Sequence, residues 1–223
     1  MFKFNDINLA EMGISVIEHF PVPVSILREE SQVIPGRDGE VTYSDGSYEG
    51  CEISGRIAII PNENYTLDDI ILALQGWGKL MIPGVPDRYF IAKVNNIVPL
   101  NQFIRNQVYE IPITFKCQPF GYLLSGYEEV TASSGKITNL GNVIAKPTFT
   151  CTANGSITIT INDRVFRTSV SEGTIIDCEL EEVIDMTNNI LTASEGVFPY
   201  LDLGENTVTI SGSMKVQWNW RCL

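Results

Sequence analysis

One short stretch of this chain has the periodicity of an amphipathic helix, and the sequence around it is dominated by strand-like patterns. Four apolar residues follow the i, i+3, i+4, i+7 spacing of one helical face: Leu67, Ile70, Ile71 and Leu74. Thr66 precedes them as an N-cap, and Asp69 is placed to complete a capping box. A lone helix in a strand-rich chain buries its apolar face against one face or end of a β structure. The sequence therefore predicts a mainly β fold that carries one helix at about residues 66–76.

Strand patterns lie on both sides of this helix. Residues 80–82 and 89–94 are predicted strands around a Pro-rich turn, and residues 51–59 and 108–117 alternate between apolar and polar side chains. Asp38-Gly39 and Asp45-Gly46 are each strong hairpin-turn signals, and they predict a long hairpin at residues 28–52. A two-stranded ribbon of this length is poorly stable alone, so we expect it to lie on a neighbouring subunit. Its candidate contact residues are Arg28, Glu29, Arg37, Asp38, Glu40, Tyr43 and Tyr48.

The chain changes character after about residue 125. Residues 126–142 are poor in large apolar side chains and rich in Ser, Gly, Thr and Asn, which predicts a linker between a first domain at residues 1–125 and a second at 143–223. In the second domain, isoleucines alternate with polar residues at 156–161, and an acidic strand is expected at 175–185. The last strand places Trp218 and Trp220 on one face. Short strands at this spacing predict a β-sandwich.

Charge and cysteine usage exclude several classes of protein. The formal net charge of −12 argues against nonspecific binding to nucleic acid or to an anionic membrane surface, because both reward basic patches. No signal sequence is visible, and no apolar run approaches the roughly 18 residues of a membrane span, so we expect no membrane anchor. The 5 cysteines are widely spaced and include no CxxC pair, which predicts buried, reduced thiols in a cytoplasm.

The sequence contains no recognisable catalytic arrangement. His19 is the only histidine, so a nucleophile–histidine pair or a histidine metal site has little to build on. The acidic strand could supply a pair of glycosidase carboxylates, but alternating acids are more simply the solvent face of an edge strand. Trp218 and Trp220 could stack on sugar rings, but their place on an apolar face favours a core position. We therefore expect neither enzyme activity nor a cofactor or metal.

Short motifs follow one another along the chain in an order and spacing that are specific when taken together. In the first half they are Val33-Ile34-Pro35-Gly36-Arg37-Asp38-Gly39, Tyr43, Asp45-Gly46, Tyr48, Trp77-Gly78-Lys79-Leu80, Pro86-Asp87-Arg88-Tyr89-Phe90 and Phe115-Lys116-Cys117-Gln118-Pro119. In the second half they are Asn139-Leu140-Gly141-Asn142, Ala145-Lys146-Pro147, Ile176-Asp177, Thr187-Asn188-Asn189, Phe198-Pro199-Tyr200-Leu201 and Gly204-Glu205-Asn206-Thr207. With these motifs the chain resembles the distal tail protein family of long-tailed bacteriophages over nearly its whole length.

The resemblance implies an α+β first domain, built as a tail-tube-like split β-barrel or sandwich with one helix and a long hairpin, followed by a galectin-like C-terminal β-sandwich. It implies a non-enzymatic hub in the virion tail that is assembled in the host cytoplasm. Such a hub forms a ring, typically of six copies, in which the hairpin of each copy lies on the next copy as a belt. The implied partners are the chain itself, the tail tube protein and the tail-associated tip protein. The tape measure protein and receptor-binding proteins are further candidates.

Some features of the family are not carried over to this chain. The second domain has only about eighty residues, so the long arm that grips receptor-binding proteins in some relatives is not expected. Galectins hold galactose with a His, an Asn, an Arg and a Trp, and no His follows His19. Two other functions stay open: a carbohydrate-binding or adhesion module of the tail tip that contacts the host cell surface, and a tail tube subunit.

The negative charge is spread over both predicted domains. Residues 1–125 hold 9 basic and 15 acidic residues, and residues 126–223 hold 6 and 12, a net charge of −6 in each. A ring would repeat the net negative charge of residues 1–125 in every copy. We therefore expect an acidic channel through which double-stranded DNA passes without specific binding, since clustered cations would capture phosphates.

Overall fold

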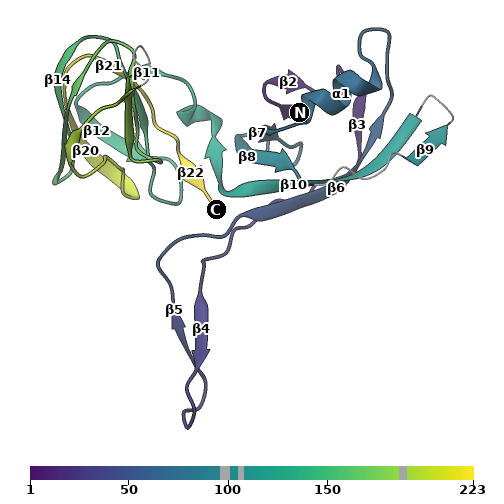
Figure 1. Cartoon of the computed structure of the whole chain (residues 1–223), viewed down its shortest axis with the longest axis horizontal. Helices are drawn as coiled ribbons and strands as arrows, with labels where there is room; N and C mark the ends of the chain where they lie inside the picture. Colours follow the sequence, from purple (N-terminus) through teal and green to yellow (C-terminus); the bar gives the residue numbers. More distant parts are fainter. Residues whose placement is uncertain (96–100, 105–107, 186–189) are drawn as a thin grey trace. The chain divides into compact units, whose positions relative to one another are not determined.

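The computed structural model describes residues 1–95, 101–104, 108–185 and 190–223, with side chains described for all of these except 101–104 and 190–191. The chain divides into two compact units, Met1–Gly121 with Leu223, and Tyr122–Cys222. Each unit is built mainly from antiparallel strands, as Figure 1 shows. Among the described residues there is one α-helix, α1 (Leu67–Ala73), and no helix long and apolar enough to cross a membrane. The prediction of a mainly β fold with one helix is confirmed.

The first unit is a single antiparallel sheet with one covering helix and one projecting hairpin. Its strands are β1 (Lys3–Phe4), β2 (Ile7–Asn8), β3 (Ile14–Glu18), β4 (Glu30–Val33), β5 (Glu40–Tyr43), β6 (Cys51–Ile59), β7 (Trp77–Met81), β8 (Arg88–Val94), β9 (Asn101–Ile104) and β10 (Val108–Leu123). The sheet order is β2-β1-β7-β8-β10-β6-β3, and β9 also pairs with β10. β6 and β10 pair in unbroken register from Ile59↔Tyr109 to Cys51↔Cys117. β4 and β5 form a separate two-stranded sheet.

The alternation along β6 and β10 turns one face of this sheet into the core. Ile53, Ile57 and Ile59 of β6 share a buried cluster with side chains of β10 and α1: Ile113, Phe115, Cys117, Ile70 and Leu74. Gly55 lies on the same face, and a Cβ there would meet the Phe20 ring at 2.6 Å. The missing side chain therefore lets Phe20 pack directly across the sheet.

The helix begins as its residues predict and ends at Ala73, three residues before the predicted residue 76. The Asp69 N–H donates to Thr66 Oγ1 at 3.3 Å, and the Thr66 N–H donates to Asp69 Oδ2 at 2.9 Å, which completes the capping box. The Thr66 hydroxyl also donates to Asp69 Oδ2 at 2.7 Å, and this bond, followed by the one from the Thr66 N–H, holds the pKa of Asp69 below its usual value. Gly76 has a φ of +79°, and β7 starts directly after it at Trp77, earlier than the predicted strand at residue 80.

Replacing Thr66 with Ala should lower the free energy of unfolding of the first unit by about 1 kcal/mol, because the first turn loses its cap. Urea unfolding followed by circular dichroism measures the change. Since the folded-state pKa of Asp69 is lowered, the cap contributes above the ordinary aspartate pKa of 3.8, and the deficit should shrink as the pH falls below it. Thr42→Ala on exposed β5 is the matched control, and an equal loss there would contradict the assignment of the effect to the cap.

The second unit is a two-layer sandwich. Its elements are a 3-10 helix (Leu124–Gly126), β11 (Val130–Thr131), β12 (Gly135–Asn139), β13 (Thr148–Cys151), β14 (Gly155–Ile161), β15 (Arg164–Val170), β16 (Thr174–Asp177), β17 (Glu182–Asp185), β18 (Ile190–Leu191), β19 (Ser194–Gly196), β20 (Gly204–Ser211), β21 (Met214–Gln217) and β22 (Arg221–Cys222). One sheet has the order β11-β21-β13-β16-β17-β18 and the other β12-β20-β14-β15-β19. Inward side chains of both sheets form one core, so the predicted sandwich is confirmed.

Two segments of the second unit differ from their sequence-based descriptions. Residues 126–142, expected to be a linker, hold β11 and β12, and β12 pairs along β20 from Gly135↔Val208 to Asn139↔Gly204. β12 is an edge strand with only Ile137 packed against the core, so it needs few large apolar residues. The acidic segment 175–185 is a hairpin of β16 and β17 rather than one strand, because Asp177 Oδ1 accepts the N–H groups of Glu179 and Leu180 and turns the chain.

The C-terminal residues follow the predicted alternation except at one position. Trp218 and Trp220 are buried and stacked, with ring centroids 5.7 Å apart, so their assignment to the core is confirmed. Arg221, which alternation with Trp218 and Trp220 would place on the opposite, polar face, is only 3% exposed. Its Nε donates to the Ile144 carbonyl at 2.7 Å and its Nη1 to Glu179 Oε1 at 3.1 Å, which offsets the cost of burying the charge. The Thr187-Asn188-Asn189 motif lies outside the described residues.

Candidate interaction site

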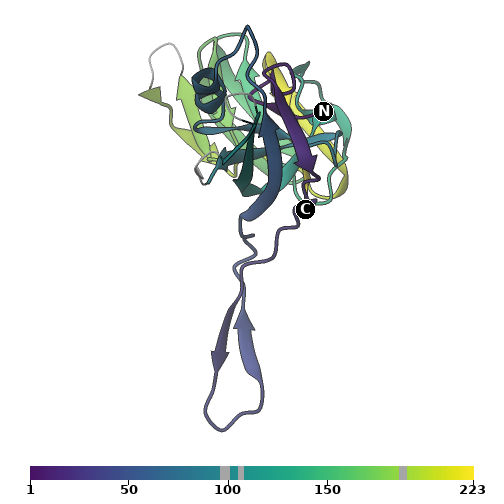
Figure 2. The same cartoon turned by 90° about the vertical axis from the view of Figure 1, so that its right-hand side faces the viewer.

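The clearest candidate site is the hairpin that leaves the sheet of the first unit, and residues 26–49 are called the ribbon from here on. The Glu49 N–H donates to the Ile26 carbonyl at 2.9 Å, Leu27 bridges Tyr48, and the ladder continues through β4 and β5 from Glu30↔Tyr43 to Val33↔Glu40. Figures 1 and 2 show β4 and β5 extending away from β6 and the sheet of this unit. Every residue from 28 to 43 is exposed, so the ribbon is held only by its own backbone pairing and its base.

The two Asp-Gly dipeptides of the ribbon have different roles. Asp38-Gly39 lies in the tip that joins β4 to β5, as predicted, and Gly39 has a φ of +79°. Asp45-Gly46 was predicted to be a second hairpin turn, and that prediction is wrong: it forms a bulge in the returning strand. The Ser47 N–H and hydroxyl donate to Asp45 Oδ1 at 2.8 Å and 2.6 Å, and these two bonds lower the pKa of Asp45. A local Asx turn satisfies this segment and interrupts the ladder without reversing the chain.

The seven candidate contact residues are distributed along the whole ribbon. Arg28 and Glu29 precede β4, Arg37 and Asp38 lie in the tip, Glu40 and Tyr43 lie in β5, and Tyr48 lies near the base. Within the part of the chain that the structure describes, none of the five charged residues forms an ion pair (Arg28, Glu29, Arg37, Asp38 and Glu40). Their charged ends are therefore available to another molecule. Their assignment to an inter-subunit contact stays a prediction.

The base of the ribbon is fixed to the sheet. The Tyr48 ring packs edge-on against Phe120, with centroids 5.4 Å apart. The buried Ser25 hydroxyl donates to the Pro119 carbonyl of β10. These contacts set the direction in which the ribbon leaves the unit, while its outer part makes none of them.

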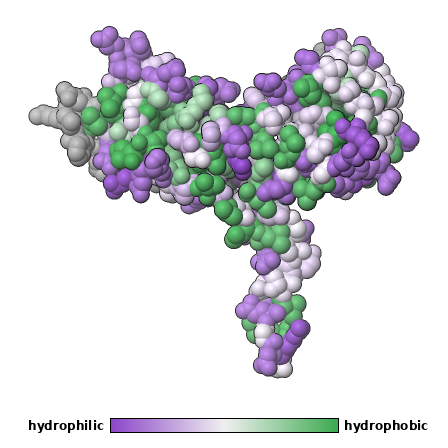
Figure 3. All heavy atoms as spheres, turned by 180° about the vertical axis from the view of Figure 1, so that it is seen from behind, coloured by the Kyte–Doolittle hydropathy of each residue, from purple (hydrophilic) through white to green (hydrophobic). Residues whose placement is uncertain are grey.

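Exposed apolar side chains are the feature of the ribbon that the sequence argument did not name. Ile26, Val33 and Tyr43 are 64%, 67% and 69% exposed, and Leu27, Ile34 and Val41 are also exposed; Val24, two residues before the ribbon, is 71% exposed. Figure 3 shows hydrophobic side chains both at the neck of this hairpin and toward its end. A run of exposed apolar side chains of this kind marks an interaction site. The signal in the sequence is Val33-Ile34 directly before Pro-Gly, where the chain offers no core to bury them.

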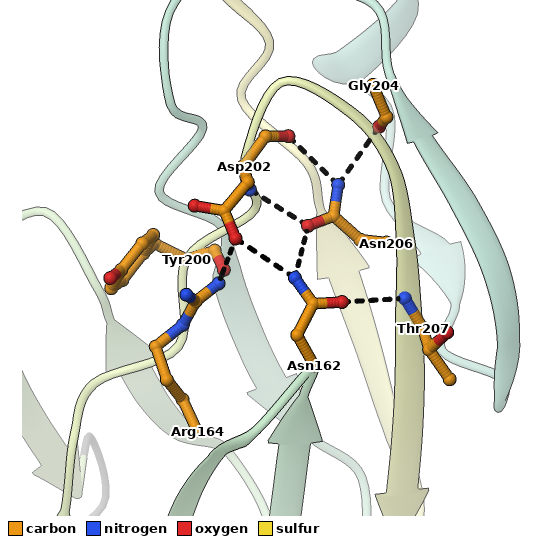
Figure 4. A network of polar contacts seen from close by, with 7 residues as sticks. All are labelled: Asn162, Arg164, Tyr200, Asp202, Gly204, Asn206 and Thr207. Carbon is orange, nitrogen blue, oxygen red and sulfur yellow. Dashed lines mark hydrogen bonds and ion pairs between the residues drawn. The ribbon is translucent and has the colours of Figure 1, made fainter.

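A cluster of polar side chains in the second unit was also not predicted from the sequence, and Figure 4 shows it. Asn206 is fully buried, and its Oδ1 accepts from the Asp202 N–H at 2.9 Å and from Asn162 Nδ2 at 3.0 Å. Its Nδ2 donates to the carbonyls of Asp202 and Gly204 at 2.9 Å and 3.0 Å. One side chain therefore makes four hydrogen bonds, and it fixes the turn into β20.

Arg164 completes this cluster at its edge. Its Nη2 donates to the Tyr200 carbonyl at 3.0 Å and to Asp202 Oδ2 at 2.8 Å, and its guanidinium lies 3.7 Å from the centre of the Tyr200 ring. Asn162 Oδ1 accepts the Thr207 N–H at 3.0 Å and closes the β14–β15 turn onto β20. Apart from Arg164 Nε, which is buried without a hydrogen-bond partner among the described residues, the polar side-chain groups are engaged with one another or with backbone groups, so we interpret the cluster as a lock on the loop between β19 and β20. This role explains two of the motifs that carried the resemblance, Phe198-Pro199-Tyr200-Leu201 and Gly204-Glu205-Asn206-Thr207.

The described residues contain no group of three or more His, Cys, Asp or Glu side chains placed to hold a metal ion. The structure thus presents a projecting ribbon on one β unit and a polar lock in a second, and the ribbon is the candidate interaction site.

No family model and no curated protein sequence matches the chain. The solved structure of the Dit protein of phage SPP1, described as a paradigm of the hub adsorption apparatus in phages that infect Gram-positive bacteria, covers 96% of this chain and 96% of its own with a TM-score of 0.64 and 15% identity. The baseplate of phage p2 in its activated conformation with Sr covers 94% and 92%, with a TM-score of 0.48 and 10% identity.

The chain therefore has the fold of a Dit-like phage tail protein. The resemblance to distal tail proteins is confirmed at the level of the fold.

Proposed function

We propose that this chain is a structural hub of a phage tail and that six copies close into a ring that joins the tail tube to the tail tip or baseplate. The observation that carries the proposal is the match to the SPP1 Dit fold, which extends over 96% of the chain and so includes both units. The role is structural and non-enzymatic. Its place is the distal end of the virion tail, after assembly in the host cytoplasm.

Ring closure requires that one surface of each copy meets a different surface of the next. A stable contact of this kind buries more than about 1,000 Å². The ribbon supports the proposal because its exposed Val33, Ile34 and Val41 would gain burial on a neighbouring copy. Its unpaired charges at Arg28, Glu29 and Glu40 would fix the orientation of that contact. The ribbon thus acts as a belt between copies.

The remaining partners follow from the position of a hub. One face of the ring meets the tail tube protein and the other meets the tail-associated tip protein, with the tape measure protein and receptor-binding proteins as further partners. Double-stranded DNA passes through the channel. The sandwich of the second unit remains on the outside of the ring.

Size and shape in solution test the proposed function. The purified chain should form sixfold rings, single or paired back-to-back, in negative-stain electron micrographs, with a mass by light scattering to match. Filaments would instead support a tube subunit, and a monomer that binds wall glycans would support an adhesion module. A monomer that forms no ring even with tail tube protein present would overturn the proposal.

The double variant Arg37→Ala/Asp38→Ala should weaken ring formation by about tenfold, because the exposed tip loses two charges that would pair with groups of the neighbouring copy. Native mass spectrometry over a dilution series measures the shift in the monomer–ring equilibrium. Arg167→Ala/Glu195→Ala is the matched control, since these exposed residues face each other on β15 and β19 of the second unit. An unchanged equilibrium in the tip variant would remove these two residues from the interface.

The ring should not bind DNA. The first 125 residues carry a net charge of −6 in each copy, and repeated negative charge opposes the counterion release that drives DNA binding. Fluorescence anisotropy of a labelled 20-base-pair duplex at 50 mM salt should therefore show no saturable binding. Binding that weakens steeply between 50 mM and 200 mM salt would reveal a cation-lined surface and contradict the acidic channel.

A further inference from the structure

Two cysteines lie directly opposite each other where the ribbon joins the sheet. Cys51 is the first residue of β6, and Cys117 is its registered partner on β10 in the antiparallel ladder. Opposed Cα atoms in such a ladder are roughly 4.5–5.5 Å apart. A disulfide requires Cα atoms about 4.4–6.8 Å apart, so the backbone already holds this pair within reach of a bond.

The surroundings of this pair separate it from the other thiols. Cys117 is buried and Cys51 is half-buried, and the Cys117 thiol donates to the Phe115 carbonyl at 3.8 Å. Among the remaining cysteines, Cys151 is opposite Met214 in its ladder. The Cys178 N–H donates to the Pro147 carbonyl in the turn after β16. In the β6–β10 ladder, by contrast, Cys51 and Cys117 are directly opposite each other.

The electrostatics give the two sulfurs different roles. Interaction with the neighbouring Cys117 thiol lowers the pKa of Cys51 to about 7, whereas interaction with Cys51 and burial raise the pKa of Cys117. Burial raises the pKa of Cys151 to about 11 and that of Cys178 well above its usual value. Because the thiolate is the nucleophile in thiol–disulfide exchange, Cys51 is the attacking group of the pair.

We propose that Cys51 and Cys117 form an oxidation site, closed to a disulfide by a small-molecule disulfide such as oxidised glutathione. The Cys51 thiolate attacks one glutathione sulfur, forms a mixed disulfide and releases one glutathione thiolate. The Cys117 sulfur, after losing its proton to solvent, then attacks the Cys51 sulfur and releases the second glutathione thiolate. Two protein thiols are oxidised and one glutathione disulfide is reduced to two thiols, so atoms and electrons balance.

The disulfide would connect β6, which starts directly after the ribbon, to β10. Tyr48 on Phe120 and Ser25 on Pro119 already fix the same junction, and the disulfide adds a covalent closure to it. The site is reduced in a cytoplasm and becomes oxidised in a medium that contains disulfides. The inference depends on the geometry of one chain and is independent of the proposed hub function.

The test is oxidation of the purified chain with excess oxidised glutathione. The intact mass should fall by two hydrogen atoms, and non-reducing peptide mapping should join the Cys51 peptide to the Cys117 peptide. The oxidised chain should unfold at a temperature at least about 5 °C higher than the reduced chain.

Two variants make the result specific. Cys51→Ser should abolish the mass loss, and Cys151→Ser, which removes a buried thiol from the second unit, should retain it. Thermal unfolding of both reduced variants checks that they fold. Glutathione retained on Cys51 without a link to Cys117, a link to another cysteine, or five free thiols after oxidation would each overturn the proposal.

Discussion

Replacing Asn206 with Asp should unfold the second unit at a urea concentration far below that of the wild-type chain, with a loss of at least about 3 kcal/mol. The side-chain Nδ2 donates to the Asp202 and Gly204 carbonyls, and a carboxylate oxygen in its place would face both as an unpaired, buried anion. Emission from buried Trp218 and Trp220 follows the transition. Because burial would raise the pKa of the new carboxyl, the deficit should shrink as the pH falls and the group protonates.

Asn154→Asp is the matched control for this substitution. Asn154 is exposed, and only its Oδ1 is engaged, as the acceptor of the Glu172 N–H, so a carboxylate preserves the bond. The free energy of unfolding of the Asn154→Asp variant should differ from that of the wild-type chain by less than about 0.5 kcal/mol. Equal stability of the two variants would mean that the buried amide is not the lock that fixes the turn before β20.

Patterns carried by one segment of chain are the part of the fold that could be predicted from sequence. The α1 face and its capping box depend on residues three and four positions apart, and the core faces of β6 and β10 depend on simple alternation. The paired tryptophans near the C-terminus follow the same rule. In each case the neighbours that matter are close in sequence.

Features that depend on distant partners could not be predicted in this way. Arg221 is buried because Ile144 and Glu179, far away in the chain, accept its hydrogen bonds. Residues 126–142 resemble a linker because β12 is an edge strand, and its pairing with β20 is invisible in its composition. Asp45-Gly46 has the residues of a hairpin turn, yet the hydroxyl of the preceding Ser44 donates to the Arg28 carbonyl of the opposite strand, so the chain continues along that strand instead of reversing.

The same limit applies to the candidate site. The charged residues of the ribbon were found because charge next to turn signals indicates a projecting hairpin. Its apolar residues could be recognised as exposed only when the structure showed that nothing from residue 28 to residue 43 packs against the rest of its unit. The buried Asn206 lock was missed because a Gly-Glu-Asn-Thr segment reads as an ordinary turn.

Shortening the ribbon should have the largest effect on assembly. In the shortened variant, a two-residue Asn-Gly turn replaces residues 28–47 and joins Leu27 to Tyr48. Leu27 and Tyr48 already form an antiparallel bridge at the base of the ribbon. Val33, Ile34, Val41 and Tyr43 are removed together, and each would contribute about 1.5–3 kcal/mol if fully buried on a neighbour. Even partial burial implies an association at least about 100-fold weaker, so native mass spectrometry should find monomers where the wild-type chain forms rings.

The fold of the shortened chain should be intact, because the removed residues contribute nothing to either core and the contacts at the ribbon's base remain. Its circular dichroism and its urea midpoint should therefore match those of the wild-type chain, which separates lost assembly from lost folding. A full-length Val33→Ser/Tyr43→Ser variant distinguishes the causes further, since it keeps the ribbon and its charges but loses apolar area. Rings from this variant with monomers from the shortened chain would assign the contact to backbone and charge. Normal rings from both would show that copies of this chain associate through the sheet of the first unit without the ribbon.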